Sequence, residues 1–185
     1  MPRQVDHAQR RKDITAAAIR ILSRGPGSQL TLRTLADELG GSITLVTHFF
    51  ASREDLFKAV VDDLIDSYDA ELAALEQGAD DVTRLRILLD WMAPSSRADV
   101  EKETGRVALI AHRNDQDSVD YFFRAMEKRM RQLLRSHLEP LLPPETLSHG
   151  VDFLRVTVDG MVLSAVEHPT RWSRKRQERL LDTAL

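Results

Sequence analysis

The sequence contains no cysteine, few aromatic residues and no long hydrophobic run. Without cysteine there can be no disulfide framework, no thiolate nucleophile and no cysteine-bound zinc or iron–sulfur cluster. No apolar run approaches the roughly 18–20 residues that a membrane span needs, and the first residues lack the apolar stretch of a signal peptide. With 42% hydrophobic and 30% charged residues over 185 positions, we expect a globular, cytoplasmic protein with no membrane partner.

The N-terminal third of the chain is basic, although the chain as a whole is acidic. Residues 1–53 hold eight Lys or Arg and four Asp or Glu, a net charge of +4. Because the whole chain carries −3, the remaining residues carry −7. This asymmetry is expected where one part of a protein meets a polyanion, with chance clustering as the alternative.

Apolar residues recur at intervals of three and four along the whole chain, which predicts an all-α protein of about nine helices. Thr31 is a plausible N-cap, and Gly40-Gly41 ends the helix that follows it. Ser42 can cap a short third helix, and Ser52 opens a long fourth one with the spacing of a capping box. The predicted N-terminal helices cover residues 14–22 (ended by Gly25-Pro26-Gly27), 32–39, 42–50, and Ser52 to about Gln77.

Prolines and polar capping residues mark the predicted ends and starts of the remaining helices. Pro94 stops one helix, and a capping box at Ser96–Asp99 opens the next. A long amphipathic stripe then runs from Val119 to Leu138, and a helix from Glu145 ends at Pro169. Ser173 can start a final helix. No repeat or low-complexity linker interrupts this pattern.

Two short helices separated by a glycine turn, behind a supporting first helix, form a helix-turn-helix pattern. Val46, Phe49 and Phe50 would face inward, which leaves the opposite face of the third helix free to enter a DNA major groove. The alternative is an ordinary helical hairpin within a bundle. The candidate DNA-binding residues on this face and at the flanking helix starts are Thr31, Arg33, Ser42, Ile43, Thr44, Leu45, Thr47, His48 and Arg53.

The segment Ile14–Leu64, with TLRTLADELGGSITLVTHFFASREDLF at its centre, resembles the N-terminal domain of the TetR family of transcriptional regulators. The resemblance rests on Ala17-Ala18, the Gly25 region, Thr31, Leu35-Ala36, Leu39-Gly40, Ser42, Phe50 and Ser52–Leu56. It implies a homodimeric repressor with a DNA-binding domain at 1–52 and a ligand-binding and dimerisation domain at 53–185. The tail, Thr157–Leu185, is weakly similar to the BetI-like subgroup.

Three residues depart from the family pattern. Gly41 stands where the family usually has an apolar residue, so the turn lacks a side chain that would pack into the core. Thr44 replaces a common glycine, and Thr47 replaces a frequent tyrosine that reaches a phosphate. With Ile43 and Leu45 also on this face, we expect it to read thymine methyl groups more than to form bidentate hydrogen bonds.

The helix over 151–166 is apolar on two faces, and both must be buried. One face can pack on the chain's own core and the other on a twofold-related copy, which gives a homodimer with a four-helix interface. A central helix within a monomer is the alternative. The candidate interface residues are Phe153, Val156, Gly160, Leu163, Leu180 and Leu181.

A ligand site is expected in the C-terminal helices, where the resemblance implies one. Its candidate residues are large apolar side chains with two polar ones: Trp91, Met92, His112, Phe122, Met126, Thr157 and Met161. Ordinary core packing is the alternative for each. The expected effector is small and mainly apolar, and it would favour a conformer with lower affinity for a palindromic DNA operator.

No motif of an enzyme, a cofactor site or a metal site is present in the sequence. The six histidines do not form H-E-x-x-H, and Glu145 with His149 is more typical of a surface pair than of a metal site. We therefore expect no catalysis, no cofactor and no metal. The rival hypothesis is a helical homodimer that senses ligands or binds proteins but has lost specific operator binding.

Overall fold

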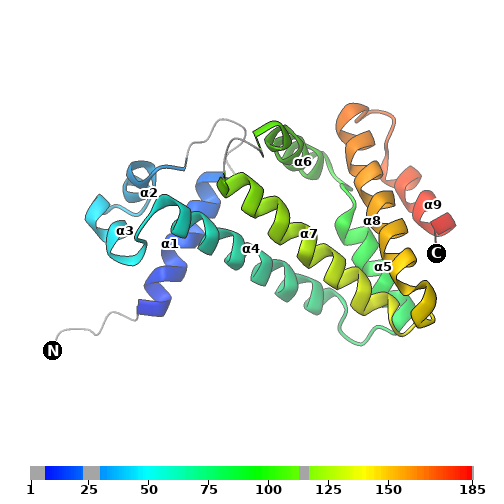
Figure 1. Cartoon of the computed structure of the whole chain (residues 1–185). Helices are drawn as coiled ribbons and strands as arrows, with labels where there is room; N and C mark the ends of the chain where they lie inside the picture. The colour runs from blue at the N-terminus through cyan, green and yellow to red at the C-terminus, as the bar shows by residue number, and fades with distance from the viewer. Residues whose placement is uncertain (1–6, 23–29, 113–116, 185) are drawn as a thin grey trace.

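The described residues form an all-α protein without strands, as the sequence predicts. The computed structural model describes residues 7–22, 30–112 and 117–184. These contain nine α-helices and one short 3-10 helix (Figure 1). No helix in this part of the chain is both long enough and apolar enough to cross a membrane. The helices are α1 (His7–Leu22), α2 (Leu32–Glu38), α3 (Ile43–Phe49), α4 (Arg53–Leu75), α5 (Asp81–Met92), α6 (Arg97–Leu109), η1 (Ile110–His112), α7 (Asp117–Leu138), α8 (Pro144–Glu167) and α9 (Arg174–Ala184).

Most of the predicted helix starts are confirmed by their caps. The Thr31 hydroxyl accepts a hydrogen bond from the Thr34 amide (3.0 Å), while the Thr34 hydroxyl accepts one from the Thr31 amide (2.9 Å). Ser52 caps α4 and Ser96 caps α6. Ser42 is the exception, because it occupies the N-cap position of α3 without forming a side-chain hydrogen bond.

Several helix bounds differ from the prediction, most of them by one or two residues. α1 begins at His7, well before Ile14, because polar residues prolong it without contributing to the apolar pattern. α4 ends at Leu75, just short of the predicted Gln77. The predicted end of the first helix at Gly25–Gly27 lies outside the described residues.

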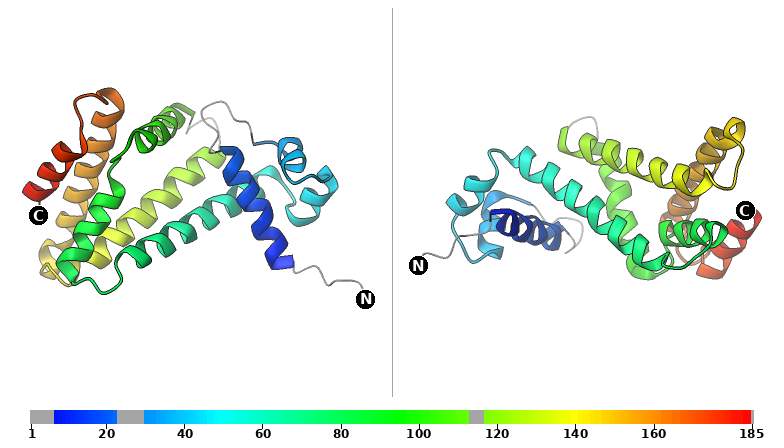
Figure 2. Two further views of the ribbon diagram at one scale, coloured as in Figure 1. Left: turned by 180° about the vertical axis from the view of Figure 1, so that it is seen from behind. Right: turned by 90° about the horizontal axis from the view of Figure 1, so that it is seen from below.

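The protein has two hydrophobic cores, and α4 contributes to both. The N-terminal core combines α1, α2 and α3 with the first turns of α4, through Leu56, Ala59 and Val60. The C-terminal core begins at Leu72, near the other end of α4, and includes residues of α5, α7, α8 and α9. Figures 1 and 2 show α4 running from the α2–α3 end of the molecule into the helical body, with α7 beside it.

A buried polar cluster ties the far end of α4 to α5 and α7. The His137 Nε2 atom lies 2.5 Å from a Glu76 carboxylate oxygen, and its Nδ1 atom lies 2.7 Å from the Leu133 carbonyl oxygen. Arg84 donates a hydrogen bond to the other Glu76 oxygen (3.1 Å). Because both imidazole nitrogens have a partner, the cluster fixes where α4, α5 and α7 meet.

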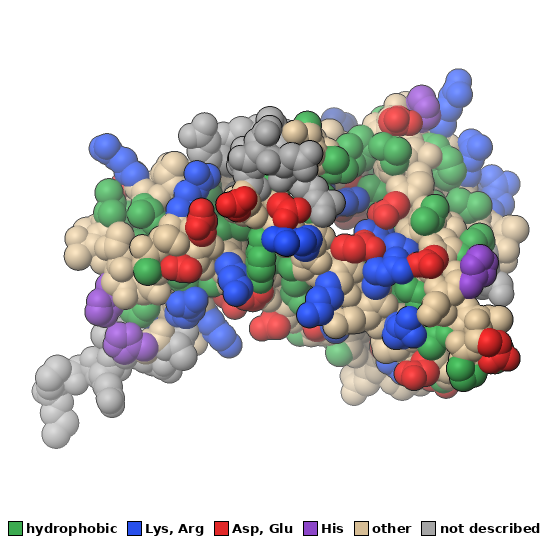
Figure 3. All heavy atoms as spheres, viewed as in Figure 1, with side chains coloured by type: hydrophobic (Ala, Val, Ile, Leu, Met, Phe, Trp, Pro, Cys, Tyr) green, Lys and Arg blue, Asp and Glu red, His purple; other side chains and the backbone are tan. Residues whose placement is uncertain are grey.

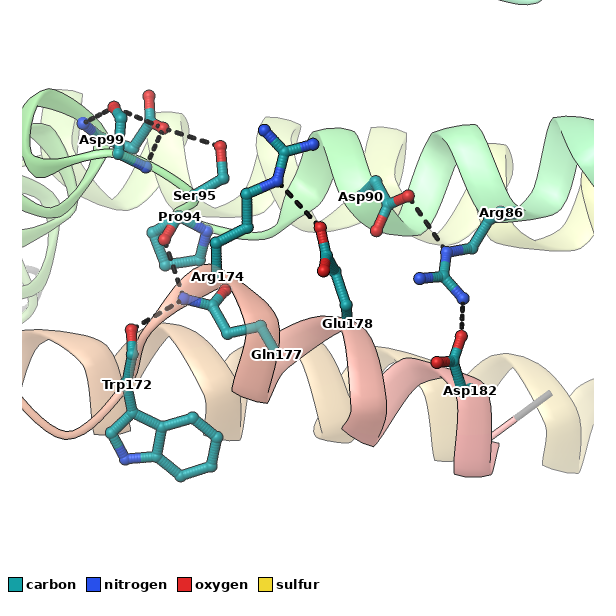
Figure 4. Close-up of polar contacts among 11 residues, drawn as sticks. Arg86, Asp90, Pro94, Ser95, Asp99, Trp172, Arg174, Gln177, Glu178 and Asp182 are labelled. Atoms are coloured by element: carbon teal, nitrogen blue, oxygen red, sulfur yellow. Dashed lines mark hydrogen bonds and ion pairs between the residues drawn. The ribbon is translucent and has the colours of Figure 1, made fainter.

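α9 is held on the body by a polar seam along its inner face (Figure 4). The Gln177 amide nitrogen donates to the carbonyl oxygens of Pro94 (2.9 Å) and Trp172 (3.3 Å). Arg86 on α5 pairs with Asp182. Leu181 is completely buried in the C-terminal core beside this seam.

The Gln177 carbonyl oxygen is buried and has no partner among the described residues. The side-chain amide of Gln177 cannot be flipped, because its oxygen would then face the carbonyl oxygens of Pro94 and Trp172. The side chain lines a hollow of about 30 Å³ between α5 and α9, together with Asp90, Ser95 and Arg174. A space of this size accommodates one water molecule.

Candidate nucleic-acid interface

The third helix turns one face inward and the other outward, as predicted. Val46 is completely buried, and Phe50, just after the helix, packs in the N-terminal core. Ile43 is 46% exposed, and Thr44, Thr47 and His48 are also exposed. The structure therefore brings the predicted recognition residues together on one outward surface, with Leu45 differing from the others because it is half-buried.

The two glycines of the turn have different roles. Gly40 has φ +61°, a left-handed conformation that glycine adopts without steric penalty. Gly41 is not among the described residues with positive φ. A Cβ atom at Gly41 would lie 2.9 Å from the Leu45 Cδ2 atom, so the Leu45 side chain occupies the space beside Gly41.

The flanking candidates lie at helix starts next to this surface. Arg33, Ser42 and Arg53 are exposed, whereas Thr31 is half-buried and its hydroxyl is engaged in the cap of α2. Because the first amides of a helix and nearby guanidinium groups attract anions, this arrangement suits phosphate binding. In the view of Figure 3, Lys and Arg side chains and imidazole rings lie at the α2–α3 end of the molecule.

Two of the outward side chains also contact the protein itself. The Thr47 hydroxyl donates a hydrogen bond to the Thr44 carbonyl oxygen (3.3 Å), within the same helix. The His48 ring lies 5.7 Å from the ring of His7, at the start of α1, and 5.2 Å from that of Phe49. The end of α3 is thus packed against the first turn of α1.

Arg11 positions α3, and the sequence reasoning missed it. Its Nη1 atom donates a hydrogen bond to the Phe49 carbonyl oxygen (3.1 Å), and its guanidinium lies 4.3 Å from the Phe50 ring centroid. A cation at the C-terminal end of a helix binds its free carbonyl groups and complements the helix dipole. No sequence signal indicates this contact, because the residues are 38 positions apart.

Adjacent carboxylates on α4 bind the helices on either side of it. Asp63 accepts a hydrogen bond from the buried Thr15 hydroxyl of α1. Asp62 accepts one from the Tyr121 hydroxyl of α7 (2.9 Å). Partial burial and this hydrogen bond to a carboxylate raise the pKa of Tyr121. α4 therefore connects the helix-turn-helix to the body through direct polar contacts.

Four of the predicted ligand residues lie in or around the C-terminal core. Trp91, Met92 and Met126 are half-buried around the C-terminal core, while Met161 is 1% exposed within it. Trp91 packs edge-on against Tyr68 of α4 (5.3 Å between centroids), and Lys102 of α6 lies over the same Tyr68 ring. Tyr68 and Lys102 were not among the predicted ligand residues.

The other ligand candidates have different local contacts. Phe122 is half-buried and packs edge-on against Phe123, and the Thr157 hydroxyl donates to the Phe153 carbonyl oxygen (2.8 Å). The side chain of His112 lies outside the described residues. A hollow of about 520 Å³ lies between the helix-turn-helix and α4, and its lining includes Arg11, Phe49 and Lys58.

The candidate dimer residues divide into an exposed set and a buried one. Phe153 is 51% exposed and Val156 is 70% exposed, and Gly160, Leu163 and Leu180 are also exposed. Leu181 is fully buried in the core of its own chain, so it cannot contribute surface to an interface between copies. Neighbouring positions on α9 point in different directions, which the run of two leucines did not reveal.

Comparisons with known proteins agree with the geometry of this site. Residues 14–60 match the family described as bacterial regulatory proteins, tetR family. The chain is 26% identical over 192 residues to the HTH-type transcriptional regulator PksA of Bacillus subtilis, covering 98% of this chain and 90% of that protein. It is 22% identical over 164 residues to the HTH-type transcriptional regulator BetI of Agrobacterium fabrum, covering 88% and 80%.

The fold is shared with solved structures. A transcriptional regulator from Saccharomonospora viridis, crystallised in complex with choline, superposes with a TM-score of 0.70 at 15% identity, over 95% of each chain. The family match covers the helices that form the outward-facing helix-turn-helix, and the similarity to full-length regulators continues through the helical body. Residues 14–60 therefore form a helix-turn-helix domain of the tetR family, and the chain as a whole is similar to DNA-binding transcriptional regulators of that family, which are not enzymes.

Proposed function

We propose that this regulator is a homodimeric repressor that binds a palindromic operator in the cytoplasm and releases it when a small, mainly apolar ligand binds. Residues 1–52, with Arg53 at the start of α4, would contact DNA, and residues 53–185 would bind the ligand and dimerise. The observation that carries the proposal is the outward face of α3, mounted on a core that buries Val46 and Phe50.

In this proposal α3 lies in the major groove. Ile43 and Leu45 offer apolar contacts to thymine methyl groups, while Thr44, Thr47 and His48 offer polar contacts to base edges or phosphates. Arg33 and Arg53, with the N-terminal amides of α2 and α4, would bind DNA phosphates on either side of the major groove.

The exposed apolar face of α8 supports the homodimer. Phe153, Val156, Gly160 and Leu163 alternate at spacings of three and four, the pattern with which two helices pack along a common seam. Apart from the adjacent backbone of α8 and the neighbouring residues, no described atom lies within 4 Å of the place where a Gly160 Cβ would stand, so a partner helix can approach closely there. A twofold dimer would place its two recognition helices in half-sites about 34 Å, or a multiple of it, apart.

The ligand would enter the body beside the half-buried side chains of Trp91, Met92 and Met126. Aromatic and methionine side chains can rearrange around an apolar molecule, and Phe122, Thr157, Met161 and His112 remain candidates for its lining. A solved protein of the same fold holds a small molecule, choline. A ligand that binds better to a DNA-incompetent conformer lowers operator affinity by linkage.

The experiment is a selection of bound fragments from random duplex DNA, followed by titration of the selected duplex and a scrambled duplex. We expect a palindromic site bound about 10³-fold or more tightly than the scrambled one, with affinity falling steeply between 50 and 200 mM salt. Equal binding of both duplexes would refute operator recognition. It would favour the rival function, a ligand-sensing dimer, for which the supporting observation is that the Thr47 hydroxyl bonds within its own helix.

A further inference from the structure

We propose that Gly41 is a positioning residue for DNA sequence recognition: it leaves a space in the turn that Leu45 of α3 fills, which fixes where Leu45 meets the groove. The inference deepens the proposed function and rests on it. It assigns a role in base preference to a residue that lies outside the recognition helix.

Backbone geometry does not explain the second glycine of the turn. Gly40 adopts φ +61°, whereas Gly41 is not among the described residues with positive φ. The Gly41 amide donates to the Ala36 carbonyl oxygen (3.0 Å), and the Leu45 amide donates to the Ser42 carbonyl oxygen (3.0 Å). Both residues are therefore held in a hydrogen-bonded frame that alanine could also adopt.

The space that the Leu45 side chain needs explains why position 41 is glycine. A Cβ atom at Gly41 would lie 2.9 Å from the Leu45 Cδ2 atom and 3.9 Å from its Cβ atom. Such a contact is too short for two carbon atoms, whose optimal separation is about 3.5–4.0 Å. Leu45 can occupy its present position only because residue 41 has no side chain.

The same contact accounts for the partial burial of Leu45. Ile43 and Thr44, which precede it on the outward surface, are both exposed. One part of Leu45 packs beside Gly41 in the turn, and the rest faces outward. A methyl group held in one place can distinguish thymine from the other bases, whereas a freely rotating one averages over several positions.

An alanine at position 41 would turn Leu45 outward. Its methyl group would displace the end of a flexible side chain and no backbone atom, so the turn itself can remain intact. The displaced Leu45 would meet different base edges. We therefore expect Gly41→Ala to change base preference at the base pairs that Leu45 faces, while contacts to phosphates are unchanged.

The experiment compares four proteins: wild type, Gly41→Ala, Leu45→Ala and the double variant. Each is used to select from random duplex DNA, and relative affinities are then measured for every base at each site position. We expect Gly41→Ala to change preference about fivefold or more at the positions that Leu45→Ala also changes. In the Leu45→Ala background, the substitution at 41 should have no further effect.

Gly105→Ala is the matched control, because a Cβ there meets no described atom within 4 Å and the residue lies in α6, away from α3. It should leave preference unchanged. An unchanged preference in Gly41→Ala, or equal effects of that change with and without Leu45, would overturn the proposal. If Gly41→Ala fails to fold, the Gly41→Ala/Leu45→Val variant, whose shorter side chain relieves the contact, is used in the same selection.

A measurement without DNA separates this inference from the proposed function. In the wild-type protein, nuclear Overhauser effects should connect the Gly41 α-protons to a Leu45 methyl group. Their absence would refute the contact whatever the DNA result. If they are present but the wild type prefers no duplex, operator recognition fails, and the role of Gly41 in base preference fails with it.

Discussion

Replacing Phe153 with alanine should dissociate the proposed homodimer without unfolding the protomer. Phe153 lies on the outward face of α8, and 51% of it is exposed in the single chain. It belongs to neither hydrophobic core. Its truncation therefore removes surface that only a second copy could cover.

The expected loss can be worked out from the exposed area. A phenylalanine side chain buries about 150–250 Å² when fully covered, so the exposed half corresponds to about 100 Å². At about 25 cal/mol per Å², covering this area contributes about 2.5 kcal/mol, of which alanine retains a small part. A twofold dimer contains the residue twice, so the loss is about 4 kcal/mol and the dimer dissociation constant rises about 10³-fold.

Sedimentation equilibrium over a range of protein concentrations measures this constant directly. Leu75→Ala is the matched control, because Leu75 is 53% exposed but lies at the end of α4, outside the α8 face. It should leave dimerisation unchanged. A dissociation constant within a few-fold of wild type for Phe153→Ala, or equal weakening in both variants, would refute the assignment of this face.

Three further predictions concern single side chains. Arg11→Met should remove the hydrogen bond to the end of α3, lowering stability by about 1–2 kcal/mol in denaturant titration and weakening operator binding; unchanged values for both would contradict its positioning role. Thr47→Ala should weaken binding to cognate and scrambled duplexes by the same factor, whereas a loss confined to the cognate duplex would assign Thr47 to base recognition. A hydrogen bond from the backbone amide of Thr83 lowers the pKa of Asp80 below its ordinary value of 3.8. The Asp80 charge therefore stabilises the fold at pH values above 3.8, and this stabilisation is lost as the pH falls through the lower pKa of the folded state. Asp80→Asn should therefore be less stable than wild type at neutral pH and equal to it in strong acid, and a difference independent of pH would exclude the charge effect.

The helical pattern was readable in the sequence because apolar spacing and capping residues are local signals. Thr31, Ser52 and Ser96 cap helices as their positions predicted. Ser42 has the same residue type and position but forms no capping bond. A residue type thus predicts where a helix can start better than it predicts which hydrogen bond forms there.

Contacts between distant positions were not predictable in this way. Arg11 reaches the end of α3, and His137 reaches Glu76, only because the fold brings separate helices together. The direction of each side chain was also ambiguous: Leu180 and Leu181 have the same chemistry, but only Leu181 is fully buried. Leu45 was placed on the outward face, and its partial burial depends on the missing side chain at Gly41.

The shared helix α4 has a consequence for dissecting this protein. A fragment that stops at residue 52 would lack Leu56, Ala59 and Val60, which complete the N-terminal core. Expressed alone, such a piece would expose the apolar sides of α1 and α3 and would not hold a stable shape. The smallest autonomous DNA-binding unit must therefore extend beyond Val60, and heating the whole chain should melt both halves together, since one continuous helix is part of each.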